Sequence, residues 1–347
     1  MTTTNELAKL AQLLNVNSSS VGIGNTTVNT SLSVSGSNIS PVQSFRNKII
    51  NGNFDIWQRG TSTSTNGAYC ADRWLTSSTG STFTSSRQAF TLGQTDVPNE
   101  PSYWHRTVVT SVAGAGNYII WGQRIESVRS CAGKTIAISF WAKADASKNI
   151  AIEFIQNFGT GGSPSSTVTG IGVTTCTLTT TWTKFTSTVT IPSISGKTIG
   201  SDNNDYVAIN FWLNAGSTFN SRTNSLGQAS GTYDFSQVQI EEGSVTTPFE
   251  MRPIGIELNL CYRYYCFDNN EYHMLPAPGA TFASMYQVKY PVDMRATATL
   301  AFNYTSSYAI GSYTSYNINN KGFRHFISAS ISTNASMYFN WTANAEL

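Results

Sequence analysis

Apolar side chains recur at every second position in a series of short segments that begins near residue 47. This period of two places the apolar side chains on one face of a β-strand. The clearest segments have apolar positions at Ile136, Ile138 and Phe140; at Ile150, Ile152, Phe154 and Phe158; at Phe185, Val189 and Ile191; and at Val207, Ile209, Phe211 and Leu213. Clusters of turn-forming residues separate these segments, and no segment between them has the period of a helix. The pattern predicts an all-β, two-sheet jelly-roll sandwich over residues 46–250.

A second, shorter series of alternating segments follows near the carboxyl end of the sequence. Its apolar positions are Ala298, Leu300, Phe302 and Tyr304; His325, Ile327, Ala329 and Ile331; and Met337, Phe339 and Trp341. These strands predict a small C-terminal β domain over residues 276–347. A sandwich of this size buries little surface alone, so we expect it to lean on a neighbouring domain or on a symmetry mate.

The stretch between the two series reads as a connector, residues 251–275. Gly243 marks a turn, and Pro248 and Pro253 fix φ and oppose helix. The segment from Ile256 to Tyr265 then predicts a short helix that packs the two β domains together.

The first 45 residues have a different pattern. Thr3 and Glu6 have capping-box spacing, and leucines follow at helical intervals, which predicts a short amphipathic helix over residues 4–15. The apolar stripe consists of Leu7, Leu10, Leu13 and Leu14. A helix this short is marginal alone, so the stripe needs a docking partner. We interpret residues 1–45 as this helix plus an extended anchoring arm; the alternative is a disordered leader.

The composition limits the classes of partner that the sequence predicts. Only 12% of residues are charged and the formal net charge is +2, with no run of Lys or Arg, so nucleic acid is not predicted as a partner. No signal-peptide core and no stretch of about 18 apolar residues occurs, so neither secretion by signal peptide nor membrane insertion is predicted. The five cysteines lack CxxC spacing, which favours reduced thiols over a disulfide framework or a zinc site.

Motifs for catalysis are missing, and we predict that the chain is not an enzyme. The sequence contains no HExxH, GxSxG or GxxxxGK[ST] motif. Glu241 and Glu242 are adjacent in a predicted strand, so they point to opposite faces and cannot share one glycosidic bond. A polysaccharide-degrading enzyme remains the less favoured alternative, because folding can bring other carboxylates together.

Several blocks of the sequence resemble proteins of bacteriophage tails. The blocks are NGNFDIWQRG (51–60) with ADRW (71–74), IQNFGTGGSPSSTVT (155–169), IPSISGKTIGSDNNDYVAINFWL (191–213), QIEEGSVTTPFEMRPIGIELNLCYRYY (239–265), YPVDMRATATL (290–300) and WTANAEL (341–347). The chain is similar to the family of phage tail-fibre and virion structural proteins, whose jelly-roll domain is related in plan to carbohydrate-binding modules.

The resemblance implies a tail fibre in the virion, assembled in the host cytoplasm and commonly a homotrimer. Residues 1–45, with the four leucines, would dock on other virion proteins. The rest would attach to the host surface by multivalent contacts, with a glycan or another envelope receptor as the partner. A head fibre or capsid-decorating protein with the same domains is the alternative.

No organic cofactor is predicted. The likeness to carbohydrate-binding modules implies a structural calcium ion, since such jelly rolls often tie strands together with a cation bound by oxygen atoms. Asn53, Asp55 and Asp234 stand in comparable places in this sequence.

Aromatic residues are the candidates for sugar contact, because a flat ring stacks on the apolar face of a sugar. The late cluster Tyr304, Tyr308, Tyr313 and Tyr316 lies among Ser, Gly and Asn, a composition typical of adaptable binding surfaces. Trp104 and Trp212 are further candidates. Packing in the core is the alternative for each tryptophan.

Overall fold

The structure of the chain is a computed structural model that describes residues 14–16, 21–23, 32–34, 37–39, 44–275, 283–308, 310–329 and 335–347. Two compact units are present, Met1–Arg46 and Asn47–Leu347. The domain boundaries predicted at residues 45, 250 and 275 stay predictions.

In the first unit, short strands form a sheet in the order β1-β2-β3-β4. They are β1 (Leu14–Val16), β2 (Val21–Ile23), β3 (Leu32–Val34) and β4 (Ser37–Ile39). Leu7, Leu10 and Leu13 of the predicted helix lie outside the described residues. Leu14 pairs with Ile23 in an antiparallel ladder, so the predicted helix end at residues 14–15 is wrong. A marginal short helix gives way there to strand pairing.

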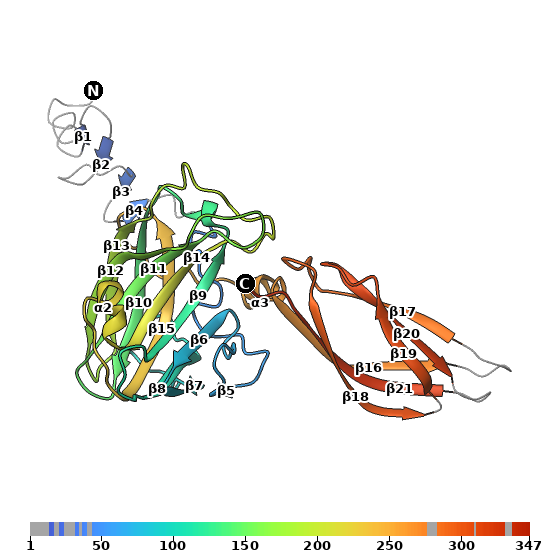
Figure 1. Cartoon of the computed structure of the whole chain (residues 1–347). Coiled ribbons are helices and arrows are strands. Elements are labelled where there is room, and N and C mark those ends of the chain that lie inside the picture. Colours follow the sequence, from blue (N-terminus) through green and yellow to red (C-terminus); the bar gives the residue numbers. More distant parts are fainter. Residues whose placement is uncertain are drawn as a thin grey trace, which may run out of the picture. The chain divides into compact units, whose positions relative to one another are not determined.

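The body of the second unit is a jelly-roll sandwich of two antiparallel sheets, which confirms the predicted all-β fold (Figure 1). The six-stranded sheet has the order β13-β10-β15-β8-β7-β5 and the five-stranded sheet the order β12-β11-β14-β9-β6. Their bounds are β5 (Ser62–Thr63), β6 (Trp74–Thr79), β7 (Thr82–Ala89), β8 (Tyr103–Thr110), β9 (Tyr118–Glu126), β10 (Thr135–Ala144), β11 (Lys148–Asn157), β12 (Val168–Leu178), β13 (Thr183–Thr190), β14 (Tyr206–Ala215) and β15 (Gly231–Glu242). Short helical turns are η1 (Val128–Ser130), η2 (Ser217–Phe219) and α2 (Asn220–Thr223).

Alternating apolar residues from both sheets fill the space between them. Phe140 of β10, Phe211 of β14 and Phe235 of β15 are fully buried in one cluster. Trp121 stacks on Trp74 with ring centroids 4.2 Å apart and on Phe235 at 4.5 Å. Aromatic rings bury large areas, so this stack supplies much of the apolar surface that the sandwich removes from water.

A β-bulge in β15 keeps its apolar residues facing the core. The register against β10 shifts between Ser139 and Trp141, and Gln237 has a φ of 50°. The extra residue lets Phe235 on one side and Val238 on the other both point inward, and both are fully buried. The apolar spacing near the end of this strand therefore follows the bulge rather than a strict period of two.

A C-terminal β unit follows the sandwich. Helix α3 (Ile254–Tyr262) leads into β16 (Tyr265–Leu275), β17 (Ala283–Lys289), β18 (Thr299–Tyr308), β19 (Ile310–Tyr316), β20 (Gly322–Ala329) and β21 (Ala335–Asn344). Two three-stranded sheets result, β16-β21-β18 and β17-β20-β19. The predicted short helix is confirmed, but it begins at Ile254 and ends before Tyr265, which starts β16. Pro253 precedes the helix with a φ of −54°, a value suited to a helix start.

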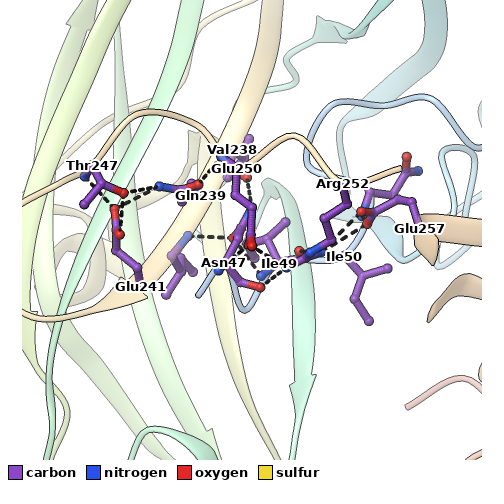
Figure 2. A network of polar contacts seen from close by, with 12 residues as sticks. Asn47, Ile49, Ile50, Val238, Gln239, Glu241, Thr247, Glu250, Arg252 and Glu257 are labelled. Carbon is purple, nitrogen blue, oxygen red and sulfur yellow. Dashed lines mark hydrogen bonds and ion pairs between the residues drawn. The ribbon is translucent and has the colours of Figure 1, made fainter. Parts of the chain in front are cut away.

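The stretch that leaves the sandwich is held by a network of polar contacts (Figure 2). The side-chain oxygen of Asn47 accepts hydrogen bonds from the backbone of Ile49 and Ile240, each 3.0 Å long. The backbone nitrogen of Asn47 donates to Glu250 at 2.9 Å, and the amide oxygen of Gln239 accepts from the backbone of Glu250 at 2.8 Å. Residues far apart in the sequence are thus fastened at one place.

Arg252 extends the same network toward helix α3. It is 6% exposed at its side chain, donates to the backbone oxygen of Ile49 at 3.0 Å and lies 3.3 Å from the carboxylate of Glu257. Figure 2 shows Arg252 between the Asn47 segment and Glu257. Buried charges of this kind need such partners, so the network fixes the point where the chain leaves the sandwich.

Among the helices of the described residues, none has the length and apolar character that would let it cross a membrane.

Candidate functional site

The four tyrosines predicted to bind ligand do not share one face of the C-terminal β unit. Tyr304 packs against the core of this unit, and its ring centroid lies 4.1 Å from that of Tyr313, which is 47% exposed. Burial raises the pKa of Tyr304 to about 12. Tyr316 instead pairs in register with exposed Arg324 on an outer face, and Tyr308 is 62% exposed. Positions of opposite parity on a strand point to opposite faces, so the predicted surface is divided. Ligand binding by Tyr304, Tyr308, Tyr313 and Tyr316 stays a prediction.

The two tryptophans have packing roles in the structure. Trp212 is fully buried: its ring packs on Phe219 at 5.0 Å, and its indole nitrogen donates to Glu153 at 2.9 Å. The prediction that Trp212 binds ligand is therefore wrong, because no face of its ring is open. Trp104 is half-buried and packs against Phe90 with ring centroids 4.6 Å apart.

The predicted calcium ligands do not form one set. Arg106 donates to both carboxylate oxygens of Asp234, at 2.7 and 2.8 Å. Asp55 accepts a hydrogen bond from Asn53 at 2.9 Å, and burial raises the pKa of Asp55, which disfavours its charged form. No group of three His, Cys, Asp or Glu side chains within the described ranges is placed to hold a metal ion. The residues present therefore do not fit the predicted site, because a guanidinium already occupies Asp234.

The candidate acids and bases have structural roles. Glu241 is buried and accepts a hydrogen bond from the Thr247 hydroxyl at 2.7 Å, whereas Glu242 lies 2.6 Å from exposed Lys134. This confirms that the adjacent glutamates face opposite sides. All three histidines are buried, and burial lowers the pKa of each. The value falls to about 3 for His105 and to about 4 for His273 and His325.

A groove crosses the outer face of the five-stranded sheet, and it is the strongest candidate site in the sandwich. Its volume is about 190 Å³. Strands β6, β9, β14 and β11 supply its floor, and α2 supplies one wall. The residues that line the groove include Ile120, Gly122, Arg124, Tyr206, Asn210 and Arg222.

Small residues keep the groove open. Gly122 of β9 stands opposite Asn210 of β14 in the ladder, and a Cβ at Gly122 would lie 2.2 Å from the backbone oxygen of Ile209. Ala208, the next outward position on β14, stands opposite Arg124. Half-buried Ile120 adds apolar surface to the floor. The groove thus combines an apolar floor with polar side chains along its length.

The polar wall of the groove is organised by the fully buried carboxylate of Glu153. Arg222 donates to both of its oxygens, at 2.6 and 2.8 Å, and the backbone of Gly170 donates at 2.7 Å. Trp212 donates as described above, and the amide nitrogen of Asn210 lies 3.4 Å away. A bidentate pair is rigid, so Arg222 stands in the groove wall with little freedom of movement.

An aromatic ring closes the other end of the groove. Tyr206 is half-buried, and the guanidinium of Arg124 lies 4.9 Å from its ring centroid. Arg124 also donates to the backbone oxygen of Leu347. Nearby, burial raises the pKa of Glu126, but hydrogen bonds from Arg263 and Tyr264 outweigh this and hold it below its ordinary value.

Sequence reasoning did not find these groove residues. The one signal available was the strand YVAINFWLNA, which carries Tyr206 and Asn210 on the face opposite its core residues. Arg222 gave no signal, because a short turn brings it to Glu153 from 69 residues away in the sequence. The sequence around Arg124 likewise contained no pattern that indicated a role in a binding site.

No family model matches the chain's sequence, and neither does any curated protein. Among solved structures, a CBM4 structure matches 56% of this chain and 98% of its own, with 21% identity and a TM-score of 0.32. The family 11 carbohydrate-binding module of Clostridium thermocellum, in complex with a mixed-linked tetrasaccharide, matches 54% and 98%, with 12% identity and a TM-score of 0.33.

The enzymatically active domain of tailspike protein 4 from bacteriophage CBA120 is also similar. It matches 57% of this chain, with 16% identity and a TM-score of 0.32, and this chain covers 22% of that domain. Identities and TM-scores this low leave the fold and the function to be argued from this chain's own residues.

Proposed function

We propose that this chain is a non-enzymatic attachment protein of a tailed-phage virion, a tail fibre that binds glycan at the host surface. The groove on the outer face of the five-stranded sheet is the observation that carries glycan binding. The virion role is supported by the resemblance of the sequence to phage tail proteins.

The chemistry of the groove suits a sugar. A saccharide presents patches of C–H groups and a rim of hydroxyls, so it favours apolar surface beside fixed hydrogen-bond partners. Ile120 supplies apolar floor, and Tyr206 supplies an aromatic edge. Asn210 and Arg222 supply polar groups whose positions are set by Glu153. Such partners are preorganised, which lowers the entropic cost of binding.

The placement of carboxylates supports a protein without hydrolase activity. Glycosidases need two carboxyl groups across one cleft. Among the described residues, the groove and a second cavity of about 330 Å³ have no carboxylate in their lining, and a third cavity of about 610 Å³ has Asp293 alone. Asp55, Glu250 and Glu257 line a further cavity, but its volume is only about 10 Å³, and Arg252 pairs with both glutamates. Glu153 and Asp234 are each held by an arginine.

The proposed protein acts as a homotrimer. Several weak glycan contacts become useful when linked copies engage one surface, because the later contacts form within a tethered complex. Residues 1–45 dock the trimer on other virion proteins. Sedimentation equilibrium at micromolar concentration tests the trimer, and loss of incorporation into virions after deletion of residues 1–45 tests the docking.

Glycan binding is tested with the purified full chain on an array of bacterial envelope glycans, followed by calorimetric titration of the best ligand. The double variant Tyr206→Ala/Asn210→Ala is expected to weaken binding by about tenfold or more, since one stacking and one polar contact are lost. Tyr338→Ala is the matched control, because Tyr338 is 48% exposed and lies in β21, outside the groove. Equal affinities of the double variant and the control for the glycan would contradict glycan binding in the groove.

Two further measurements separate this proposal from its alternatives. Immunogold labelling of intact particles on the tail supports a tail fibre, whereas labelling on the capsid supports a head fibre. Release of reducing ends from envelope polysaccharide would overturn the non-enzymatic assignment.

A further inference from the structure

A cavity of about 610 Å³ opens on the outer face of the sheet β17-β20-β19. Gln287 and Lys289 of β17 and Arg324 of β20 line it, together with the turn that joins β19 to β20. Arg324 stands opposite Gln287 on one side and Tyr316 on the other in the ladder. The cavity is therefore separate from the groove of the sandwich and has an exposed aromatic ring beside it.

The rim of this cavity carries an excess of positive charge. Lys289, Lys321 and Arg324 line it, with Asp293 as the one carboxylate of the lining. Lys321 lies 3.9 Å from Asp293, and both side chains are largely exposed, at 72% and 63%. Among the described residues, no carboxylate lies within 4 Å of the charged groups of Lys289 or Arg324. The chain as a whole has 21 basic and 19 acidic residues, so this local excess is unusual for it.

The cavity is built before any ligand arrives, because its turn is tied down by hydrogen bonds. The backbone of Asn319 donates to Gly322 at 3.1 Å, and the side-chain oxygen of Asn319 accepts from Lys321 at 2.7 Å. Backbone nitrogens of Tyr290 and Met294 donate to the turn, at 3.0 and 2.7 Å. The turn is thus anchored to the segment that follows β17.

Gly322, which borders the cavity, allows β20 to approach the backbone of β17 closely. Its φ is 153°, and a Cβ there would lie 2.1 Å from the backbone oxygen of Val288. Gly322 faces Lys289 in the ladder, so the position opposite this lysine has no side chain. Tyr290 and Phe323 also border the cavity, while their buried rings pack in the core of the C-terminal unit with centroids 6.2 Å apart. The cavity thus has a cationic rim and is backed by this core.

We propose that this cavity binds the anionic group of an acidic polysaccharide, a carboxylate or a phosphodiester, through Lys289 and Arg324. Arg324 offers a planar fork suited to such groups, and Lys289 offers a mobile point charge. Tyr316 stands beside Arg324 as a stacking surface for the adjoining sugar. Its small number of cations distinguishes the cavity from a nucleic-acid site, which neutralises a long run of phosphates.

The test uses the purified full chain and four probes. Polygalacturonate carries carboxylates, poly(glycerol phosphate) teichoic acid carries phosphodiesters, dextran is neutral, and single-stranded DNA represents a nucleic acid. Affinities are measured at about 50 mM and about 500 mM NaCl, since screening at the higher concentration shortens the reach of exposed charges to a few ångströms. We expect one acidic polysaccharide to bind, its identity to tell carboxylate from phosphodiester, and its affinity to fall steeply with salt.

Variants locate the binding. Lys289→Gln/Arg324→Gln is expected to weaken binding of the acidic polysaccharide by about tenfold or more, as for loss of hydrogen bonds to charged groups. Lys184→Gln/Arg129→Gln removes the same charge from exposed positions elsewhere and is expected to change affinity less than twofold. Asp293→Asn is expected to tighten binding, a gain that a misfolded variant cannot produce.

Equal losses in the two double variants would overturn the proposal, as would equal affinity for dextran or tighter binding of DNA. No binding of either acidic polysaccharide at low salt would overturn it too. The groove variant Tyr206→Ala/Asn210→Ala is expected to leave this binding unchanged, so failure of the cavity and failure of the groove are distinguishable.

Discussion

The carboxylate of Glu153 and the guanidinium of Arg222 form a bidentate pair, with hydrogen bonds of 2.6 and 2.8 Å, at the wall of the groove. Glu153 is fully buried, while the Arg222 side chain is 26% exposed. The pair therefore joins a charge inside the protein to a group at its surface, and it links the stability of the sandwich to the shape of the groove.

Removal of the cation from this pair is expected to be costly. Arg222→Ala leaves the Glu153 charge buried without its main partner, which lowers the free energy of unfolding by about 3–5 kcal/mol. Arg222→Lys keeps a charge but loses the fork and is expected to cost less. Urea denaturation measures both. A change below about 0.5 kcal/mol for Arg222→Ala, the range of ordinary surface substitutions, would contradict this view of the pair.

Acid is expected to destabilise the chain through its buried histidines. The pKa is lowered to about 3 for His105 and to about 4 for His273 and His325, against an ordinary value near 6.5. At these three histidines the unfolded chain thus binds more protons than the folded chain in this window. Stability is then full above pH 6.5 and falls as the pH drops toward 4, by on the order of a few kcal/mol in total.

Chemical denaturation at several pH values between 7.5 and 4 checks this slope. His325→Phe places an apolar ring among Phe302 and Phe339, which lie 5.2 and 4.7 Å from the imidazole. The variant removes one titrating group and is expected to flatten the pH dependence. An unchanged slope in His325→Phe would show that this histidine does not contribute.

Glycine is required at position 322 and not at position 255. Gly322→Ala forces a Cβ onto the backbone of β17 at a positive φ, so we expect a loss of about 1–3 kcal/mol and weaker binding of acidic polysaccharide. Gly255 lies in α3, and nothing lies within 4 Å of a Cβ there. Gly255→Ala is therefore expected to stabilise by about 0.5–1 kcal/mol. Thermal melts rank the two variants, and the same sign for both would be inconsistent with this reasoning.

The cysteines are expected to stay unreactive in the native chain. All five are free and buried, as the sequence predicted for reduced thiols. Burial raises the pKa of the Cys70 and Cys176 thiols to about 11 and that of Cys266 to about 12, so the reactive thiolate is scarce. Titration with a thiol reagent at pH 8 should detect almost none before denaturation and all five after it. Rapid labelling of the native protein would contradict the burial.

Sequence alone determined the β class and several of the strands. Alternation marked β10, β11, β13 and β14, because a strand with one face in a core repeats its apolar residues at a fixed spacing that requires no knowledge of its neighbours. The same alternation predicted that Glu241 and Glu242 point to opposite faces of the strand. The prolines predicted that the chain leaves the sandwich close to α3. These are local properties, set by residues within a few positions of one another.

Only the tertiary structure decided which outward side chains meet. Trp212 is a residue type that can stack on sugars, yet Phe219 packs on its ring and its indole nitrogen donates a hydrogen bond to Glu153. Asp234 is a residue type that can bind calcium, yet Arg106 from another strand donates hydrogen bonds to both of its carboxylate oxygens. The groove and the cationic cavity likewise depend on Arg222 and Arg324 being brought beside distant strands. Strand order and register set these neighbours, and no pattern within a single segment encodes them.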